Sequence, residues 1–263
     1  MDLDLRGRRA FISGSSEGIG YAVASALAAE GAQVILNGRD PVRLAVAVDR
    51  IRSAHPGSDP SAIVADFADS EQVEALLDEL GAVDILINNV GLFDLAEFDA
   101  IDDEAWMRYF EVNVMSGVRL SRRLLGGMRE RGWGRIVFIG SESGVNVPAD
   151  MIHYGATKAA MLAVSNGLAK LTRGTSVTVN TVLGGPTLSD GVARTVRAVA
   201  DAQSLPPEVV RDAIIGQNRT TLLERFIEPE EIAHLVAYLA SPLSSATNGA
   251  ALRADGGVLT ATL

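Results

Sequence analysis

Short apolar segments alternate along the chain with longer segments of helical periodicity. Seven short segments are rich in β-branched or aliphatic residues and predict strands, at 9–13, 33–37, 62–65, 84–87, 135–139, 176–182 and 250–253. Between them, apolar positions three or four residues apart predict helices near 18–30, 41–53, 69–80, 104–130, 151–173 and 229–240. Such strict alternation is typical of an α/β doubly wound fold, with a parallel seven-stranded sheet covered by helices on both faces.

The pattern predicts one domain over residues 1–263. No Ser-, Gly- or Pro-rich linker, internal repeat or low-complexity segment divides the chain. The stretch 188–226, which contains Pro206 and Pro207, breaks the rhythm because it is too long for an ordinary connection. Its Val, Ala and Leu positions suggest short helices, and insertions of this size are often lids. We therefore expect a substrate lid over about 188–226.

Composition narrows the possible partners. The 263 residues include 33 acidic and 23 Lys and Arg side chains, a formal charge of −10, which disfavours binding to a phosphate backbone. The absence of cysteine removes disulfides and thiolate ligands, and three scattered histidines make a poor metal set, so no metal is expected. Neither a membrane span nor the apolar core of a signal peptide is recognisable. We expect a cytoplasmic protein that binds neither nucleic acid nor membrane.

A glycine-rich turn follows the first predicted strand. It reads Gly14-Ser15-Ser16-Glu17-Gly18-Ile19-Gly20 and leads directly into an amphipathic helix. Glycines allow a tight turn and a close approach of the backbone to a pyrophosphate, and the helix N-terminus favours an anion. An ordinary strand-to-helix turn is the alternative for a lone glycine pattern. The order of strand, turn and helix favours a dinucleotide.

The end of the second predicted strand bears on the choice of dinucleotide. An NAD-binding domain commonly places an acidic side chain there for the ribose hydroxyls, whereas this chain has Asn37, Gly38 and Arg39. A guanidinium suits a 2′-phosphate, and Asn37 can add a hydrogen bond. These residues predict NADP(H) over NAD(H), with NAD still possible. The alternative is a surface arginine in the turn before Asp40.

With these motifs in place, the chain resembles the short-chain dehydrogenase/reductase superfamily over essentially its whole length. Further matches are Asp66, which the resemblance assigns to the adenine ring, and Asn88-Asn89-Val90-Gly91, where the family has alanine at the position of Val90. The closing segment from Asn248 to Gly257 also resembles the family. The resemblance implies a Rossmann fold. One departure is Glu17, at a position where NADP-using relatives often have a basic residue.

The catalytic motif of that family is recognisable in Tyr154 and Lys158, which are four residues apart on a predicted helix. On one helix face, the ammonium can favour the phenolate and lower the pKa of the phenol. Ser141, thirteen residues before Tyr154, can hydrogen-bond the substrate oxygen. The resemblance adds Asn113 as the anchor of a water on the proton path and gives Lys158 a second role at the nicotinamide ribose. Adjacent His153 is assigned to a pocket wall or the surface.

The resemblance also implies a set of cofactor contacts. After the sixth strand the family has a proline where this chain has Gly184, and the hydroxyls beyond it grip the nicotinamide carboxamide; we expect a looser loop here. The expected cofactor-binding residues are Gly14, Ser16, Glu17, Gly18, Ile19, Gly20, Asn37, Arg39, Asp66, Phe67, Asn89, Val90, Gly91, Tyr154, Lys158, Gly185, Thr187 and Ser189.

Together these features predict an NADP-dependent oxidoreductase that transfers hydride between the nicotinamide and a small carbonyl or secondary alcohol substrate. Expected pocket walls are Leu92, Phe93, Glu142, Ser143, Val147 and Met151. A 3-oxoacyl-acyl-carrier-protein reductase is the specific alternative, with an acidic carrier meeting Arg129, Arg131 and Arg173. A non-catalytic dinucleotide sensor or scaffold is the alternative of another class.

The resemblance further implies a homotetramer or homodimer. Family members pair through the helices that correspond to 104–130 and 151–173 in this chain. Apolar contact is expected from Val112, Met115 and Met161.

Overall fold

Seven parallel strands form one sheet in the computed structural model, which describes residues 2–217 and 221–262. Their order across the sheet is β3-β2-β1-β4-β5-β6-β7. The strands are β1 (Arg9–Ile12), β2 (Gln33–Gly38), β3 (Ser61–Val64), β4 (Ile85–Asn88), β5 (Trp133–Ser141), β6 (Ser176–Gly184) and β7 (Ala251–Ala254). The doubly wound fold is confirmed, and the strand order reverses between β1 and β4.

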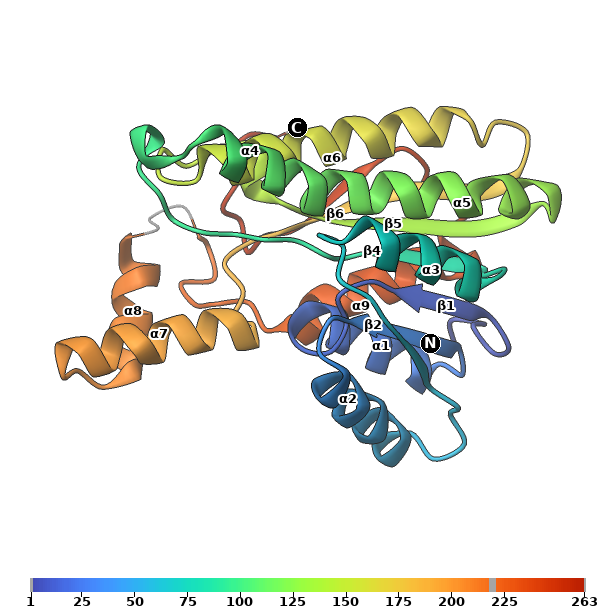
Figure 1. The fold of residues 1–263 in the computed structure, drawn as a ribbon, viewed down its shortest axis with the longest axis horizontal. Helices are drawn as coiled ribbons and strands as arrows, with labels where there is room; N and C mark the ends of the chain where they lie inside the picture. Colours follow the sequence, from blue (N-terminus) through green and yellow to red (C-terminus); the bar gives the residue numbers. More distant parts are fainter. Residues whose placement is uncertain (1, 218–220, 263) are drawn as a thin grey trace.

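Helices cover both faces of this sheet (Figure 1). One face carries α1 (Gly18–Ala29), α2 (Pro41–Ala54) and α9 (Pro229–Ala240). The other carries α3 (Ser70–Leu80), α5 (Ser116–Glu130) and α6 (Ile152–Lys170), with the short α4 (Asp103–Tyr109) beside α6. Two separate apolar cores fill the two interfaces because alternate strand residues point to opposite faces.

Local chemistry fixes several helix starts. Asp40 accepts hydrogen bonds from the backbone nitrogens of Val42 and Arg43, and Pro41 occupies the first position of α2. Asp69 caps α3 in the same way. These caps satisfy amide groups that a helix leaves without partners, and they explain why the predicted starts were close to those observed.

The predicted helix 104–130 is interrupted in the structure. Between α4 and α5 lies a π-helical segment, η2 (Phe110–Met115), that contains Asn113. Apolar periodicity predicts the helical run from Asp103 to Glu130 but does not distinguish a π-helical turn from continuous α-helix, so the sequence missed this segment. Such turns often occur at functional sites, and this one brings Asn113 beside α6.

The expected lid contains two helices, as its sequence suggested. They are α7 (Asp190–Gln203) and α8 (Pro207–Gln217), which pack on each other and project from the sheet at the side where the strands end (Figure 1). Gly184 is the last residue of β6 and pairs with both Ser141 and Ala254. Strand pairing on both sides therefore fixes Gly184 itself, and the looser loop expected after it stays a prediction.

Two expected interface residues are already used within the chain. Val112 is 5% exposed and Met161 is 2% exposed, and Met161 belongs to the core on the α5 and α6 side of the sheet. Neither can offer a free apolar surface, so their assignment to an interface was wrong. Met107 and Phe110 are the exposed apolar residues of the same region.

Candidate active site

The candidate site lies at the carboxyl ends of β1, β4 and β5. In open parallel sheets a crevice forms where the strand order reverses, and this is where such folds hold their ligands. Here the reversal separates β1 from β4. The glycine turn follows β1, the Asn-Asn-Val-Gly segment follows β4, and Ser141 ends β5. Residues that are far apart in sequence therefore meet at one edge of the sheet.

Ser141, Tyr154 and Lys158 come together at this edge. Lys158 is 5% exposed, its ammonium donates to the carbonyl of Ile139 at 2.9 Å, and it lies 5.6 Å from the centre of the Tyr154 ring. Ser141 is buried beside them and accepts a hydrogen bond from the backbone nitrogen of Ser143 at 3.1 Å. Helical spacing therefore places phenol and ammonium on one side of α6, as the sequence indicated.

Burial dominates the protonation of both groups. It raises the pKa of Tyr154, and hydrogen bonding with Ser141 opposes this effect while the nearby Glu142 carboxylate adds to it. Burial lowers the pKa of Lys158 to about 8, although Glu142 pulls in the opposite direction. The expected lowering of the Tyr154 pKa is therefore not found in this structure, because the loss of water raises this pKa more than the hydrogen bond with Ser141 lowers it. At neutral pH the phenol keeps its proton and the lysine its charge.

Asn113 is fully engaged with protein groups. Its amide oxygen accepts from the backbone nitrogen of Leu92 at 2.6 Å, and its amide nitrogen donates to the Leu92 carbonyl and to the Thr157 hydroxyl, both at 3.0 Å. These contacts tie the segment after β4 to α6. Asn113 thus holds the two sides of the catalytic cleft at a fixed separation.

A cleft of about 490 Å³ runs across the glycine turn to Gly91 and Leu92, the segment to which Asn113 is hydrogen-bonded. Gly14 and Gly18 adopt positive φ angles of 60° and 61°, and a side chain at Gly20 would come within 2.4 Å of the Gly14 carbonyl. The turn is held by Asn89, whose amide donates to the carbonyls of Ser13 and Gly14. Bare backbone beside a helix N-terminus is the donor set that a pyrophosphate requires, so this cradle fits a dinucleotide.

Most of the expected cofactor residues line this cleft. They are Gly14, Ser16, Glu17, Gly18, Ile19, Asn37, Arg39, Asp66, Phe67, Asn89, Val90, Gly91 and Ser189. Gly20 and Gly185 instead allow close backbone packing, since a side chain at either would meet a carbonyl oxygen at 2.4 Å. The Thr187 hydroxyl donates to the Gly185 carbonyl at 2.8 Å, so it supports the loop before α7.

The end of β2 separates the roles of Asn37 and Arg39. Asn37 is buried, and its amide bonds the Gly14 nitrogen and the carbonyls of Ile63 and Ala65. Those contacts occupy its side chain, so Asn37 holds the glycine turn and is not free to bind a phosphate. Arg39 extends into the cleft with its side chain 71% exposed and only a 4.0 Å contact to Asp66. Its guanidinium remains available to an anion.

Helix α7 supplies a cleft residue that sequence reasoning missed. Arg194 of α7 makes two hydrogen bonds to the Glu17 carboxylate, at 2.7 and 2.9 Å, and Arg43 lies 3.7 Å away. Hydrogen bonds from Arg194 lower the pKa of Glu17. Arg194 therefore neutralises the charge of Glu17, the acidic residue that departs from the family pattern. Because the two residues are 177 positions apart, no local sequence pattern could have predicted their contact.

The same helix touches the glycine turn directly. The carboxylate of Asp190, the first residue of α7, accepts a hydrogen bond from the backbone nitrogen of Gly18 at 2.7 Å. An anion therefore already finds a donor at the N-terminus of α1, as the helix dipole favours. The lid and the glycine turn form one connected surface around the cleft.

His153 has neither of its expected roles. It is 2% exposed, its ring centre lies 4.1 Å from that of Tyr109, and Trp106 meets it edge-on. It is therefore a packing residue between α4 and α6, and a pocket-wall or surface role was the wrong prediction.

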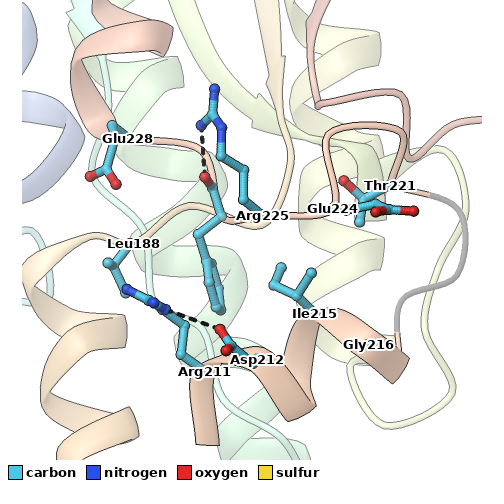
Figure 2. A pocket seen from close by; sticks show the side chains of 10 residues that line it. Leu188, Arg211, Asp212, Ile215, Gly216, Thr221, Glu224, Arg225 and Glu228 are labelled. Atoms are coloured by element: carbon cyan, nitrogen blue, oxygen red, sulfur yellow. Dashed lines mark hydrogen bonds and ion pairs between the residues drawn. The ribbon is translucent and has the colours of Figure 1, made fainter. Parts of the chain in front are cut away.

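A second cavity, of about 580 Å³, is lined by residues between Leu188 and Glu228 and lies apart from the four catalytic candidates. Figure 2 shows Arg211, Asp212 and Ile215 of α8 on one side of it, and Arg225 and Glu228 on the other. Arg225 is held by Glu231 at 2.7 Å. Over residues 2–217 and 221–262, no cluster of three potential metal ligands occurs and no helix is long and apolar enough to cross a membrane.

Comparison with known proteins agrees with this geometry. The short chain dehydrogenase family model matches residues 8–199. An uncharacterized oxidoreductase of Bacillus subtilis is 45% identical over 98% of both chains. The 3-oxoacyl-(acyl-carrier-protein) reductase of Vibrio cholerae is 32% identical over 97% of this chain and 99% of its own length.

Among solved structures, L-sorbose reductase from Gluconobacter frateurii, complexed with NADPH and L-sorbose, superposes with a TM-score of 0.94. That protein is 31% identical, and the match covers 99% of this chain and 100% of the other. A family match over most of the chain and relatives that match it over nearly their whole length lead to one conclusion: this chain belongs to the short-chain dehydrogenase/reductase family and is an oxidoreductase.

Proposed function

We propose that the protein is an NADP-dependent reductase of a small ketone or aldehyde. The observation that carries the proposal is the buried group of Ser141, Tyr154 and Lys158 beside a dinucleotide cleft that ends at the free guanidinium of Arg39. The solved neighbour with NADPH and L-sorbose supports both the cofactor and the kind of substrate. Oxidation of NADPH on addition of a carbonyl compound tests the proposal.

The residues divide the chemistry between them. The cofactor, once bound, supplies a hydride to the carbonyl carbon. Tyr154 gives its phenolic proton to the carbonyl oxygen, and its raised pKa keeps that proton in place at neutral pH. The Lys158 ammonium stabilises the phenolate left behind, while Ser141 holds the substrate oxygen by a hydrogen bond. Reduction starts from the protonated phenol, whereas the reverse reaction starts from the phenolate, which acts as the base.

Arg39 provides the test of cofactor choice. Arg39→Ala removes the exposed guanidinium and should weaken NADPH binding by about ten- to a hundredfold, because a charge-assisted pair with phosphate contributes roughly 1.5–3 kcal/mol. NADH affinity should change little, since NADH lacks the 2′-phosphate. Titration of both cofactors measures the effect, and Arg52→Ala on α2, which removes an exposed arginine paired with Asp49, is the matched control. Unchanged NADPH affinity in Arg39→Ala would reduce Arg39 to a surface residue.

The carrier-protein alternative has less support from the fold. Arg129, Arg131 and Arg173 lie just before β5 and β6, at the amino end of the sheet. Because β5 has nine residues, its start lies roughly 26 Å from Ser141 at about 3.3 Å per residue. In addition, Arg131 donates to the Val83 carbonyl at 2.7 Å. A carrier docked on these arginines would sit at the wrong end of the sheet, so we favour a free small molecule.

A non-catalytic sensor explains less of the site. Binding a dinucleotide requires the glycine turn, but it gives no reason to bury a lysine whose pKa falls to about 8 beside a buried phenol and serine. Perturbed titratable groups of this kind cluster at catalytic sites. We therefore favour an enzyme over a non-catalytic sensor. We also propose that this enzyme is cytoplasmic.

We further propose that the protein forms a homodimer or homotetramer through the α4 to α6 region. Met107 and Phe110 are 70% and 37% exposed there, which leaves apolar surface for a symmetric contact. Light scattering at micromolar concentration should give two or four times the monomer mass. Met107→Glu should lower that mass, whereas Leu243→Glu, a substitution at an exposed apolar residue beside α9, should not. A monomeric wild-type protein would reject the assembly.

A further inference from the structure

Glu142, the residue after Ser141, places a carboxylate inside the catalytic group. It accepts a hydrogen bond from the Ser141 hydroxyl at 2.5 Å and another from the Ser143 hydroxyl at 3.3 Å. Its side chain is half-buried at the start of the 3₁₀ turn η3 (Glu142–Gly144). Within residues 2–217 and 221–262, no Lys, Arg or His nitrogen lies within 4.0 Å of this carboxylate. Glu142 therefore brings negative charge to the site without an ion-pair contact, although its charge also acts on the Lys158 ammonium from more than 4.0 Å away.

This contact limits what Ser141 can do. A hydroxyl has one proton, and in this structure Ser141 donates it to Glu142 while accepting from the Ser143 nitrogen. To hold a substrate carbonyl, Ser141 must redirect its proton to the carbonyl oxygen. Glu142 then keeps only the longer hydrogen bond from the Ser143 hydroxyl, and the loss of the shorter one is unfavourable for a partly buried carboxylate. A substrate that offers Glu142 a new donor removes that penalty.

We propose that Glu142 is a substrate-recognition residue that selects neutral hydroxyketones, with a hydroxyl beside the carbonyl, and rejects carboxylates such as β-keto acids. The hydroxyl gives Glu142 the hydrogen bond that Ser141 withdraws. A substrate carboxylate offers no proton and meets a like charge in a half-buried site. This inference rests on the proposed reductase activity and names the substrate class for the same site.

A cation in the cleft could instead favour anionic substrates. Arg108 of α4 lines the cleft together with Leu92 and Phe93. If Arg108 governed recognition, anionic substrates would be preferred. The short contact between Glu142 and Ser141 places the acid directly on the group that binds the reacting oxygen, and this proximity favours rejection of anions.

Two matched substrate pairs separate these possibilities. Acetoacetate and ethyl acetoacetate differ in charge, whereas 1-hydroxy-2-butanone and 2-butanone differ in the adjacent hydroxyl. The wild-type protein with NADPH should favour the neutral ester and the hydroxyketone, each by about tenfold or more in kcat/KM. Glu142→Gln keeps an oxygen acceptor for Ser141 but removes the charge. It should raise kcat/KM for acetoacetate by about tenfold, whereas kcat/KM for ethyl acetoacetate should change by less than about threefold.

Controls make the outcome decisive. Glu74→Gln removes one exposed negative charge on α3. It should leave unchanged the ratio of kcat/KM between ester and acetoacetate and the ratio between hydroxyketone and ketone. If Glu142→Gln turns over none of the four compounds, the dissociation constants of acetoacetate and ethyl acetoacetate can be measured on the NADP-bound variant and on wild type. Their ratio then reports the preference for the neutral ester over the anion. A wild-type preference for acetoacetate, or equal ratios in wild type and Glu142→Gln, would overturn the inference and leave the reductase intact. If wild type reduces no carbonyl compound at all, the proposed function itself fails.

Discussion

Tyr154→Phe should lower kcat by about 10²- to 10⁴-fold, the usual contribution of a positioned general acid. The phenylalanine keeps the ring within α6 and removes only the hydroxyl that gives the proton. Because Tyr154 does not line the cleft around the glycine turn, the dissociation constant of NADPH should stay within about threefold of wild type. Steady-state kinetics and cofactor titration measure the two effects separately.

Tyr238→Phe is the matched control for this prediction. Tyr238 lies on α9 on the other face of the sheet and is 37% exposed, so loss of its hydroxyl should leave kcat unchanged. Near wild-type turnover in Tyr154→Phe would remove Tyr154 from the proton-transfer step. A parallel loss in both variants would point instead to general damage to the fold.

Lys158→Met should abolish turnover and yet stabilise the folded protein. The buried ammonium has its pKa lowered from 10.5 to about 8, so at neutral pH the folded state carries a charge that burial disfavours. That pKa shift corresponds to about 3 kcal/mol of destabilisation of the folded state, which the variant removes. The variant also loses the hydrogen bond to Ile139, which costs about 1 kcal/mol. We expect a net gain of about 1–3 kcal/mol in the free energy of unfolding at pH 7.

The pH dependence identifies the cause of that gain. Between about pH 8 and 10.5 the unfolded lysine holds a proton that the folded one releases, so wild-type stability rises with pH relative to the variant. Urea unfolding at about pH 7 and about pH 10 should therefore show the advantage of Lys158→Met shrinking at the higher pH. Lys170→Met, at the exposed end of α6, should show neither effect. A variant less stable than wild type at pH 7 would contradict a strained active-site lysine.

The features that sequence patterns predicted well are those set by local spacing. The strand at 33–37 and the helix at 229–240 appear as β2 and α9 with nearly the same bounds, because their patterns and capping residues act within a few positions. The glycine turn and the pair Tyr154 and Lys158 were found for the same reason. Membership of one family then allowed Ser141 and Asn113 to be placed, although neither residue is distinctive alone.

What the sequence missed depends on contacts across the fold. The pairing of Arg194 with Glu17 joins the lid to the glycine turn, and no local pattern links these two residues. Asn37 lies beside the cleft as expected, but its amide is hydrogen-bonded to the backbone of the glycine turn and of β3. The pKa of Tyr154 was misjudged because spacing does not reveal burial, which raises this pKa more than the hydrogen bond with Ser141 lowers it.

The most direct test of the proposed NADP-dependent reductase is the rate of NADPH oxidation by the purified protein on addition of ketones, hydroxyketones and aldehydes. The same assays with NADH and with Tyr154→Phe complete the measurement. We expect carbonyl-dependent oxidation of NADPH, slower turnover with NADH at equal subsaturating concentration, and loss of turnover in Tyr154→Phe. Carbonyl-dependent oxidation that prefers NADH, or that persists unchanged in Tyr154→Phe, would contradict it, as would a protein that binds NADPH tightly but oxidises it with no carbonyl compound.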